Sequence, residues 1–293
     1  MNCVVVFGFL LVAGAVARDV SVLPVIGYHE SVGIPAAERI REAENDIGKQ
    51  IEQRIVGGVV SQINAHPHLA GLVISLVNIA GVSVCGSSLL NHNRLVTAAH
   101  CWFDGNHQAW QFTVVLGSQF LFTGGTRIAT SNIFVHPEWT PSLIANDVAI
   151  ITLPHPVTFG VGIQPISLPQ GNEMFESFVN DWATAVGYGV TSDQQQSVSP
   201  STVVSEVNVQ VISVDLCQLT FGHFVRDSNI CTSGFGGVGI CGGDSGGPLF
   251  IQRGGRRILI GISSFVAGIG CELGHPSAFA RVTSFQEFIN QFL

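Results

Sequence analysis

Two short segments carry side chains whose chemistry is complementary. Residues 242–248 (GGDSGGP) surround Ser245 with glycines and one acid, and residues 97–101 (TAAHC) place His100 among small side chains. A serine hydroxyl is a poor nucleophile until a neighbouring base removes its proton as it attacks, and a neutral imidazole can do this near pH 7. Flanking glycines let the backbone turn sharply and bring N–H groups against a reacting carbonyl. The two segments therefore predict acyl transfer, with Ser245 as nucleophile and His100 as base.

A third segment supplies the group that would orient this base. Asp147 stands at the head of an apolar strand in residues 146–150 (NDVAI), where a carboxylate is costly without a partner. Taken singly, a histidine is more often structural and an Asp that begins a strand is more often a cap. The GGDSGGP segment is more specific, because a plain turn does not require Ser, Asp and Pro together. The three segments in one chain predict a Ser245–His100–Asp147 triad.

Composition indicates an all-β protein. Only 11% of the 293 residues are charged, against about 25% in ordinary soluble domains, and 34 are glycines. Short β-like runs separated by turn signals are found at residues 72–77, 114–116, 148–153, 203–212 and 258–262, and residues 191–202 are predicted to form an exposed loop. A capping-box pattern at Ser284 predicts a helix at the C-terminus. The net charge of −8 argues against nucleic acid as a partner.

The first 54 residues differ from the rest. An apolar run at 4–16 ends in a small-x-small pattern at 15–17, which predicts a signal peptide over 1–17 and secretion. The run is shorter than the ~20 residues that span a bilayer, so no membrane anchor is expected. Residues 18–54 are more charged, with a helix-like pattern over 36–54. The remainder, 55–293, is expected to be the catalytic domain.

Seven cysteines are present, of which Cys3 lies in the signal. The six that remain are expected to form disulfides in an oxidising compartment, although spacing alone does not choose the pairs: Cys85, Cys101, Cys217, Cys231, Cys241 and Cys271. No CxxC or Cys/His cluster has zinc-ligand spacing, so neither a metal nor another cofactor is expected.

From residue 55 onward the sequence resembles the chymotrypsin family of serine proteases, most closely the digestive chymotrypsins of insects. The resemblance rests on the motifs IVGG, TAAHC, NDVA, GDSGGP and SSF. It implies a trypsin-like fold of two six-stranded antiparallel β-barrels with a C-terminal helix. His100 and Asp147 would then come from the first barrel and Ser245 from the second.

The resemblance also assigns roles around the triad. It implies an oxyanion hole made by the backbone N–H groups of Gly243 and Ser245, and a hydrogen bond from Ser264 to Asp147. The disulfide pairs that it implies are 85–101, 217–231 and 241–271. Relatives bind calcium through acids in the loop matching 117–125, and no acid is present there, so no calcium site is expected.

Residues 54–58 (RIVGG) resemble the activation site of this family. There, a trypsin-like protease would cut after Arg54, and the new amino group of Ile55 would pair with Asp244 to order the site. Residues 18–54 contain no cysteine, so no disulfide would retain them after the cut. The chain is therefore expected to be made as a zymogen.

Specificity depends on the pocket residues. Gly239 stands where trypsin-like relatives carry an acid, so cleavage after Arg or Lys is not expected. Ser264, Phe265, Val266 and Ser277 match the pocket walls. Cleavage after Phe, Tyr, Leu or Met is the favoured prediction, while a valine at 266 keeps an elastase-like preference for small aliphatic residues open.

The sequence thus predicts a secreted serine endopeptidase with protein or peptide substrates. A digestive role would place it in the extracellular space, such as a gut lumen. A trypsin-like activating protease and protein protease inhibitors are expected partners, and a monomer is the expected state. The alternative class is an inactive serine-protease homologue that acts as a binding protein.

Overall fold

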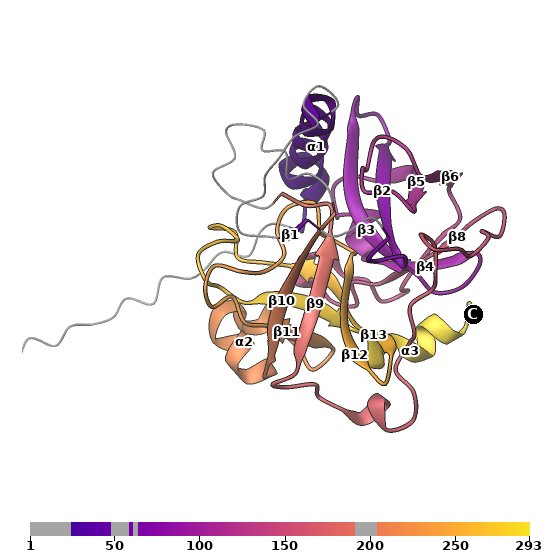
Figure 1. Cartoon of the computed structure of the whole chain (residues 1–293). Coiled ribbons are helices and arrows are strands. Elements are labelled where there is room, and N and C mark those ends of the chain that lie inside the picture. Colours follow the sequence, from indigo (N-terminus) through magenta and orange to yellow (C-terminus); the bar gives the residue numbers. More distant parts are fainter. Residues whose placement is uncertain (1–24, 48–58, 61–63, 191–203) are drawn as a thin grey trace, which may run out of the picture.

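The computed structural model describes residues 25–47, 59–60, 64–190 and 204–293 (Figure 1). The expected signal peptide, the Arg54–Ile55 bond and the whole loop predicted at 191–202 lie outside these residues. Within the described ranges, no helix is both long and apolar enough to cross a bilayer.

An antiparallel sheet forms the N-terminal half of the fold. Its strands are β2 (Leu69–Leu76), β3 (Val82–Leu89), β4 (Arg94–Thr97), β5 (Ala109–Leu116), β6 (Thr126–Thr130), β7 (Ile133–Val135) and β8 (Ala149–Thr152), in the order β6-β5-β2-β3-β4-β8-β7. The two end strands, β6 and β7, are joined by Ser131 and Asn132 alone. At this bend the Thr130 hydroxyl donates to the carbonyl of Thr152 and accepts the N–H of Asn132, which interrupts regular pairing. The expected closed first barrel is therefore a curled, open half-barrel.

The C-terminal half is a closed six-stranded antiparallel barrel. Its strands are β9 (Trp182–Gly187), β10 (Ser205–Ile212), β11 (Asn229–Thr232), β12 (Pro248–Arg253), β13 (Arg256–Phe265) and β14 (Ser277–Arg281). They follow the ring β9-β10-β11-β14-β13-β12, which pairing of β12 with β9 closes, and the short β1 (Val59–Val60) adds to β10. Side chains alternate between the two faces of each strand, so every second residue points into the barrel. In β10, for example, Val209 and Val211 are buried in the barrel core. The predicted all-β, two-barrel architecture is confirmed with the first barrel open.

The helices lie outside both sheets. α1 (Ile34–Ile47) follows a π-helical turn (His29–Gly33) and packs along β3 (Figure 1). α2 (Val214–Phe221), which the sequence did not indicate, begins after Ser213, whose hydroxyl accepts the N–H of Leu216 at 3.2 Å. Single 3-10 turns are found at Ala99–Cys101, Pro141–Leu143, Gly171–Phe175 and Gly222–Phe224.

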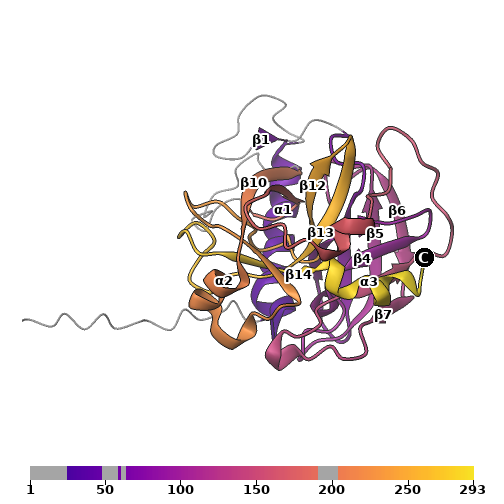
Figure 2. The same ribbon diagram turned by 90° about the horizontal axis from the view of Figure 1, so that it is seen from below.

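The predicted C-terminal helix is present as α3 (Val282–Asn290), but it begins before the expected capping box. The N-cap residue is Arg281, the last residue of β14, and no side chain caps the helix. Burial of Val282 and Phe285, one turn apart, fixes the start of the helix instead of Ser284. The helix packs against β13 and β14, and aromatic side chains in it and just after it contact Phe134 and His136, at and just after β7 (Figure 2).

The two halves meet closely where the loop bearing Ser245 crosses β3. The N–H of Gly86 in β3 donates to the carbonyl of Ser245 at 2.7 Å. A Cβ on Gly86 would lie 2.9 Å from the Cα of Gly247, nearer than side-chain carbons approach a backbone. The absence of a side chain at 86 therefore sets the position of the serine loop relative to the first half.

We predict that Gly86→Ala destabilises the protein by about 1–3 kcal/mol, because neither backbone can move without breaking the hydrogen bond. Chemical denaturation measures the change. Gly160→Ala is the matched control, since a Cβ there meets nothing within 4 Å. Equal stability of the two variants would contradict the close-contact argument.

Candidate active site

His100 and Asp147 are brought together by paired strands. β4 leads into the turn that carries His100, Asp147 precedes β8, and Thr97 lies opposite Ala149 in the β4–β8 pair. Asp147 accepts the backbone N–H of His100 at 2.9 Å and lies 2.8 Å from its Nδ1. Both side chains are buried.

A third hydrogen bond fixes the carboxylate from the other half of the fold. The hydroxyl of Ser264, in β13, donates to Oδ2 of Asp147 at 2.6 Å. Because an ionised carboxylate only accepts, Nδ1 of His100 carries the proton and Nε2 keeps its lone pair. No described residue is hydrogen-bonded to Nε2. The imidazole is therefore held in the tautomer that can accept a proton.

Ser245 lies on a tight loop between Cys241 and β12. Gly243 and Gly246 have φ of 98° and 79°, which glycine adopts without strain. The N–H of Gly246 donates to the carbonyl of Ser263 at 2.8 Å, tying the loop to β13. Tyr28 lies beside both residues: its ring centroid is 4.7 Å from that of His100, and it lines one cavity together with Ser245.

Asp244 is held by two backbone N–H groups. Its Oδ1 accepts the N–H of Gly189 at 2.8 Å and its Oδ2 accepts that of Cys241 at 2.9 Å. A Cβ on Gly187 would lie 2.0 Å from Oδ1, so the strand end can pass the carboxyl only as glycine. Burial raises the pKa of Asp244 to about 6, while the two backbone donors oppose the rise.

The residues expected to line the specificity pocket fall into two groups. Ser264, Phe265 and Val266 line one cavity together with Ser245. Gly239 and Ser277 lie against each other, since a Cβ on Gly239 would be 2.7 Å from the Ser277 hydroxyl, but they do not line this cavity.

Sequence reasoning missed part of this lining. Val25, Tyr28 and Val32 of the N-terminal segment line the same cavity, and so do Ile240 and Gly242. The helical pattern at 36–54 indicated structure near the N-terminus, but no local signal shows where such a segment docks.

Three disulfides hold the loops around the site. They join Cys85 to Cys101, Cys217 to Cys231, and Cys241 to Cys271, the pairs that the resemblance implies. Cys85, His100 and Cys101 form the one cluster with metal-ligand proximity among the described residues. Its two sulfur atoms are bonded to each other, so the cluster offers no thiolate to a metal.

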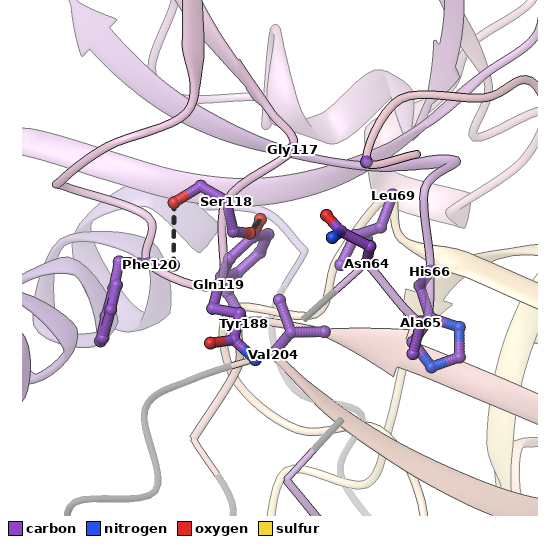
Figure 3. A pocket seen from close by; sticks show the side chains of 11 residues that line it. Asn64, Ala65, His66, Leu69, Gly117, Ser118, Gln119, Phe120, Tyr188 and Val204 are labelled. Carbon is purple, nitrogen blue, oxygen red and sulfur yellow. Dashed lines mark hydrogen bonds between the residues drawn. The ribbon is translucent and has the colours of Figure 1, made fainter. Parts of the chain in front are cut away.

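A larger cavity, of about 220 Å³, lies elsewhere (Figure 3). It is lined by Asn64 and His66 before β2, by Ser118 in the loop after β5, and by Tyr188 just after β9. No member of the predicted triad lines it. The reaction site is therefore identified by the chemistry of its side chains and not by the volume of the cavity.

Comparisons with known proteins agree with this geometry. The family model described as Trypsin matches residues 55–289. A collagenase of Hypoderma lineatum is 37% identical over 241 residues, covering 82% of this chain and 87% of the relative. Brachyurin of Leptuca pugilator is 37% identical over 238 residues, covering 80% and 96%. A solved structure of HL collagenase aligns with a TM-score of 0.72 and 36% identity, covering 81% of this chain and 97% of that one.

The chain therefore belongs to the trypsin family of serine proteases. Membership implies protein substrates, and three disulfides are consistent with an extracellular location.

The buried carboxyl of Asp244 yields a pH prediction for the uncut chain. Its pKa in the folded state, about 6, lies above the 3.8 of a free aspartate, so the folded chain binds the extra proton. Its stabilising contribution is full below pH ~4 and is lost as pH rises to ~6. Relative to Asp244→Asn, the wild-type chain should lose about 1–3 kcal/mol of stability between pH 4 and pH 7.

Urea denaturation of both uncut chains at four pH values measures this difference, with every other titrating group cancelling. A difference that is flat, or that grows in favour of the wild type, would contradict the raised pKa.

Proposed function

We propose that the chain is a secreted serine endopeptidase, made as a zymogen, with Ser245 as nucleophile, His100 as base and Asp147 as the group that orients the base. The observation that carries the proposal is the buried Asp147 carboxylate, which accepts from His100 and from Ser264 and leaves Nε2 of the imidazole bare. A bare ring nitrogen alone is not diagnostic, since His29, His66 and His68 also have one. His100 differs because its other nitrogen is paired with a buried carboxylate that Ser264 also holds.

The reaction follows from this arrangement. The Ser245 oxygen forms a bond to the scissile carbonyl carbon while its proton passes to Nε2 of His100. The carbonyl electrons move to the oxygen, which the N–H groups of Gly243 and Ser245 stabilise. Collapse of this intermediate breaks the C–N bond, and the leaving amine takes the proton from His100. Water then repeats the sequence on the acyl-enzyme and releases the acid.

Activation is proposed to follow removal of two segments. The signal 1–17 is removed on secretion, and a trypsin-like protease cuts between Arg54 and Ile55, freeing the domain 55–293. The new amino group of Ile55 pairs with Asp244, whose carboxyl is buried against the loop that carries Ser245. A cation there would stabilise the ionised carboxylate that burial now disfavours. We place the enzyme in the extracellular space, with a digestive role in a gut lumen.

For specificity we propose cleavage after large apolar residues, Phe, Tyr, Leu or Met. Support comes from the apolar wall formed by Phe265, Val266 and Ile240 beside Ser245, and from the uncharged Gly239. A preference for small aliphatic residues is the alternative, because a valine at 266 would make the pocket shallower. One relative bears the name collagenase, so collagen belongs in the panel of protein substrates.

A fluorophosphonate probe tests the proposed catalysis. We expect the chain cut at Arg54–Ile55 and freed of the fragment 18–54 to be labelled on Ser245, and Ser245→Ala to be unlabelled. The Arg54→Gln precursor should resist the cut and stay unlabelled. No labelling of the cut wild-type chain, even after the fragment 18–54 has been removed under denaturing conditions and the domain refolded, would favour the inactive-homologue alternative.

Val266→Gly tests the pocket wall. Removing the side chain should raise the ratio of kcat/KM for a Phe substrate over a Val substrate by about 10-fold, since a few methylene groups in an apolar pocket are worth that much. Val161→Gly, at a valine that is 83% exposed, is the control. An unchanged ratio in Val266→Gly would show that the Val266 side chain does not limit the size of the substrate side chain.

A further inference from the structure

The N-terminal segment, residues 25–45, enters the cavity beside Ser245. Val25, Tyr28 and Val32 line it together with Ser245, Ser264 and Val266, and the remaining space is about 30 Å³. That volume holds about one water molecule. A substrate side chain therefore has no room while the segment is in place.

Tyr28 occupies the reacting centre itself. Its buried ring meets the His100 ring at 64°, and its hydroxyl donates to the carbonyl of Val84 at 2.9 Å. The Ser245 side chain and the Gly243 backbone N–H favour the ionised form of the same hydroxyl, but burial outweighs them and raises its pKa. The neutral phenol thus engages both the nucleophile and a donor proposed for the oxyanion hole.

The residues after Tyr28 cover the neighbouring glycines. A Cβ on Gly242 would lie 3.1 Å from Cγ1 of Val32, and one on Gly243 would lie 3.6 Å from Cβ of Ala36. Tyr28 itself has helical backbone angles, φ −48° and ψ −45°, and leads into the π-helical turn. Because proteases bind substrate backbone in extended form, the bond after Tyr28 is not presented for cleavage.

A second contact lies outside the cleft, on the loop after β5. The carboxylate of Glu44 in α1 accepts the backbone N–H groups of Leu121 and Phe122 and the hydroxyl of Thr123, and Arg127 attracts it. This loop, residues 117–125, has no acidic residue of its own. The loop therefore forms a carboxylate site that α1 fills.

Between these two contacts the segment packs like a core element. Ile40 is fully buried in the core cluster of the N-terminal half, and Ala36 and Ala37 join it. His29 is buried, with its N–H donated to Asp104 at 2.9 Å and its Nδ1 2.9 Å from the Ser83 hydroxyl. All of these contacts precede residue 47, so a cut after Arg54 touches none of them.

We infer that the N-terminal segment is a built-in inhibitor that stays bound after the Arg54–Ile55 cut, with Tyr28 seated at Ser245 and Glu44 seated on the 121–123 loop. The inference rests on the proposed protease function. It makes activation a two-step process. Cutting frees Ile55, but activity appears only when the fragment dissociates. The mature domain consequently carries a second site, away from the cleft, for an acidic helical peptide.

The test uses the full chain, cut at Arg54–Ile55 and assayed at once with a small ester substrate. Freshly cut wild-type enzyme should have low specific activity that rises on 100-fold dilution. Tyr28→Ala should be fully active immediately, with fragment affinity weakened at least about 30-fold. Tyr28→Phe, which keeps the ring, and Glu44→Gln should each weaken the fragment about 10-fold. Glu38→Gln, at an exposed position of the same helix, should match the wild type.

Size-exclusion chromatography of the cut chain gives a readout that does not depend on catalysis. Co-elution of the fragment with the domain in the wild type, and its loss in Tyr28→Ala and Glu44→Gln, supports the inference. Separation of the wild-type fragment, or full activity at once on cutting, overturns it while leaving the protease proposal intact. Co-elution without labelling of Ser245 in any variant, including Tyr28→Ala, supports the docking and contradicts the protease proposal.

Discussion

One buried carboxylate organises the site. Asp147 accepts two hydrogen bonds from His100, in the N-terminal half, and one from Ser264, in the C-terminal barrel. An ionised group at 2% exposure is tolerable only with such partners, so the two halves must meet in the register that supplies them. The close contact between the serine loop and Gly86 also fixes how the two halves meet, because it holds the Ser245 backbone against β3. The contacts that hold the two halves of the fold together are therefore the same contacts that assemble the site.

Much of this arrangement could be predicted because it is encoded locally. The segments around His100, Asp147 and Ser245 each contain the small residues or the polar group that the site needs. Each segment also lies directly next to a strand, at the end of β4 or before β8 and β12. The open first barrel and the start of α3 were not predicted, because neither follows from a local motif. The barrel is open at the bend where Thr130 bonds Thr152 and Asn132, and α3 begins where its side chains become buried. At α3, burial of Val282 and Phe285 outweighs the local cap at Ser284. The assignment of Gly239 and Ser277 to the pocket remains a prediction.

The location of the N-terminal segment lies furthest from what sequence could show. Its helical pattern is visible, but the partners of Tyr28 and Glu44 lie 56 and 77 residues further along the chain. Nothing in the segment itself distinguishes a tyrosine that fills an active site from one on a surface. In the structure this segment lines the cavity beside Ser245. Under the proposed activation, control of the enzyme would therefore depend on the affinity of the fragment as well as on chain cleavage. The raised pKa of Asp244 concerns the proposed cleavage step. In the uncut chain this carboxyl is enclosed without the amino group of Ile55, its proposed partner.

Asp147 fixes His100 with a proton on Nδ1 and a lone pair on Nε2. Nitrogen NMR of chain labelled with ¹⁵N-histidine measures this directly, with Asp147→Asn used to assign the His100 signals. At pH 8 the account predicts a protonated Nδ1 with a strongly downfield proton and an unprotonated Nε2, and a change of tautomer in Asp147→Asn. A proton on Nε2 with a bare Nδ1 in the wild type would contradict it.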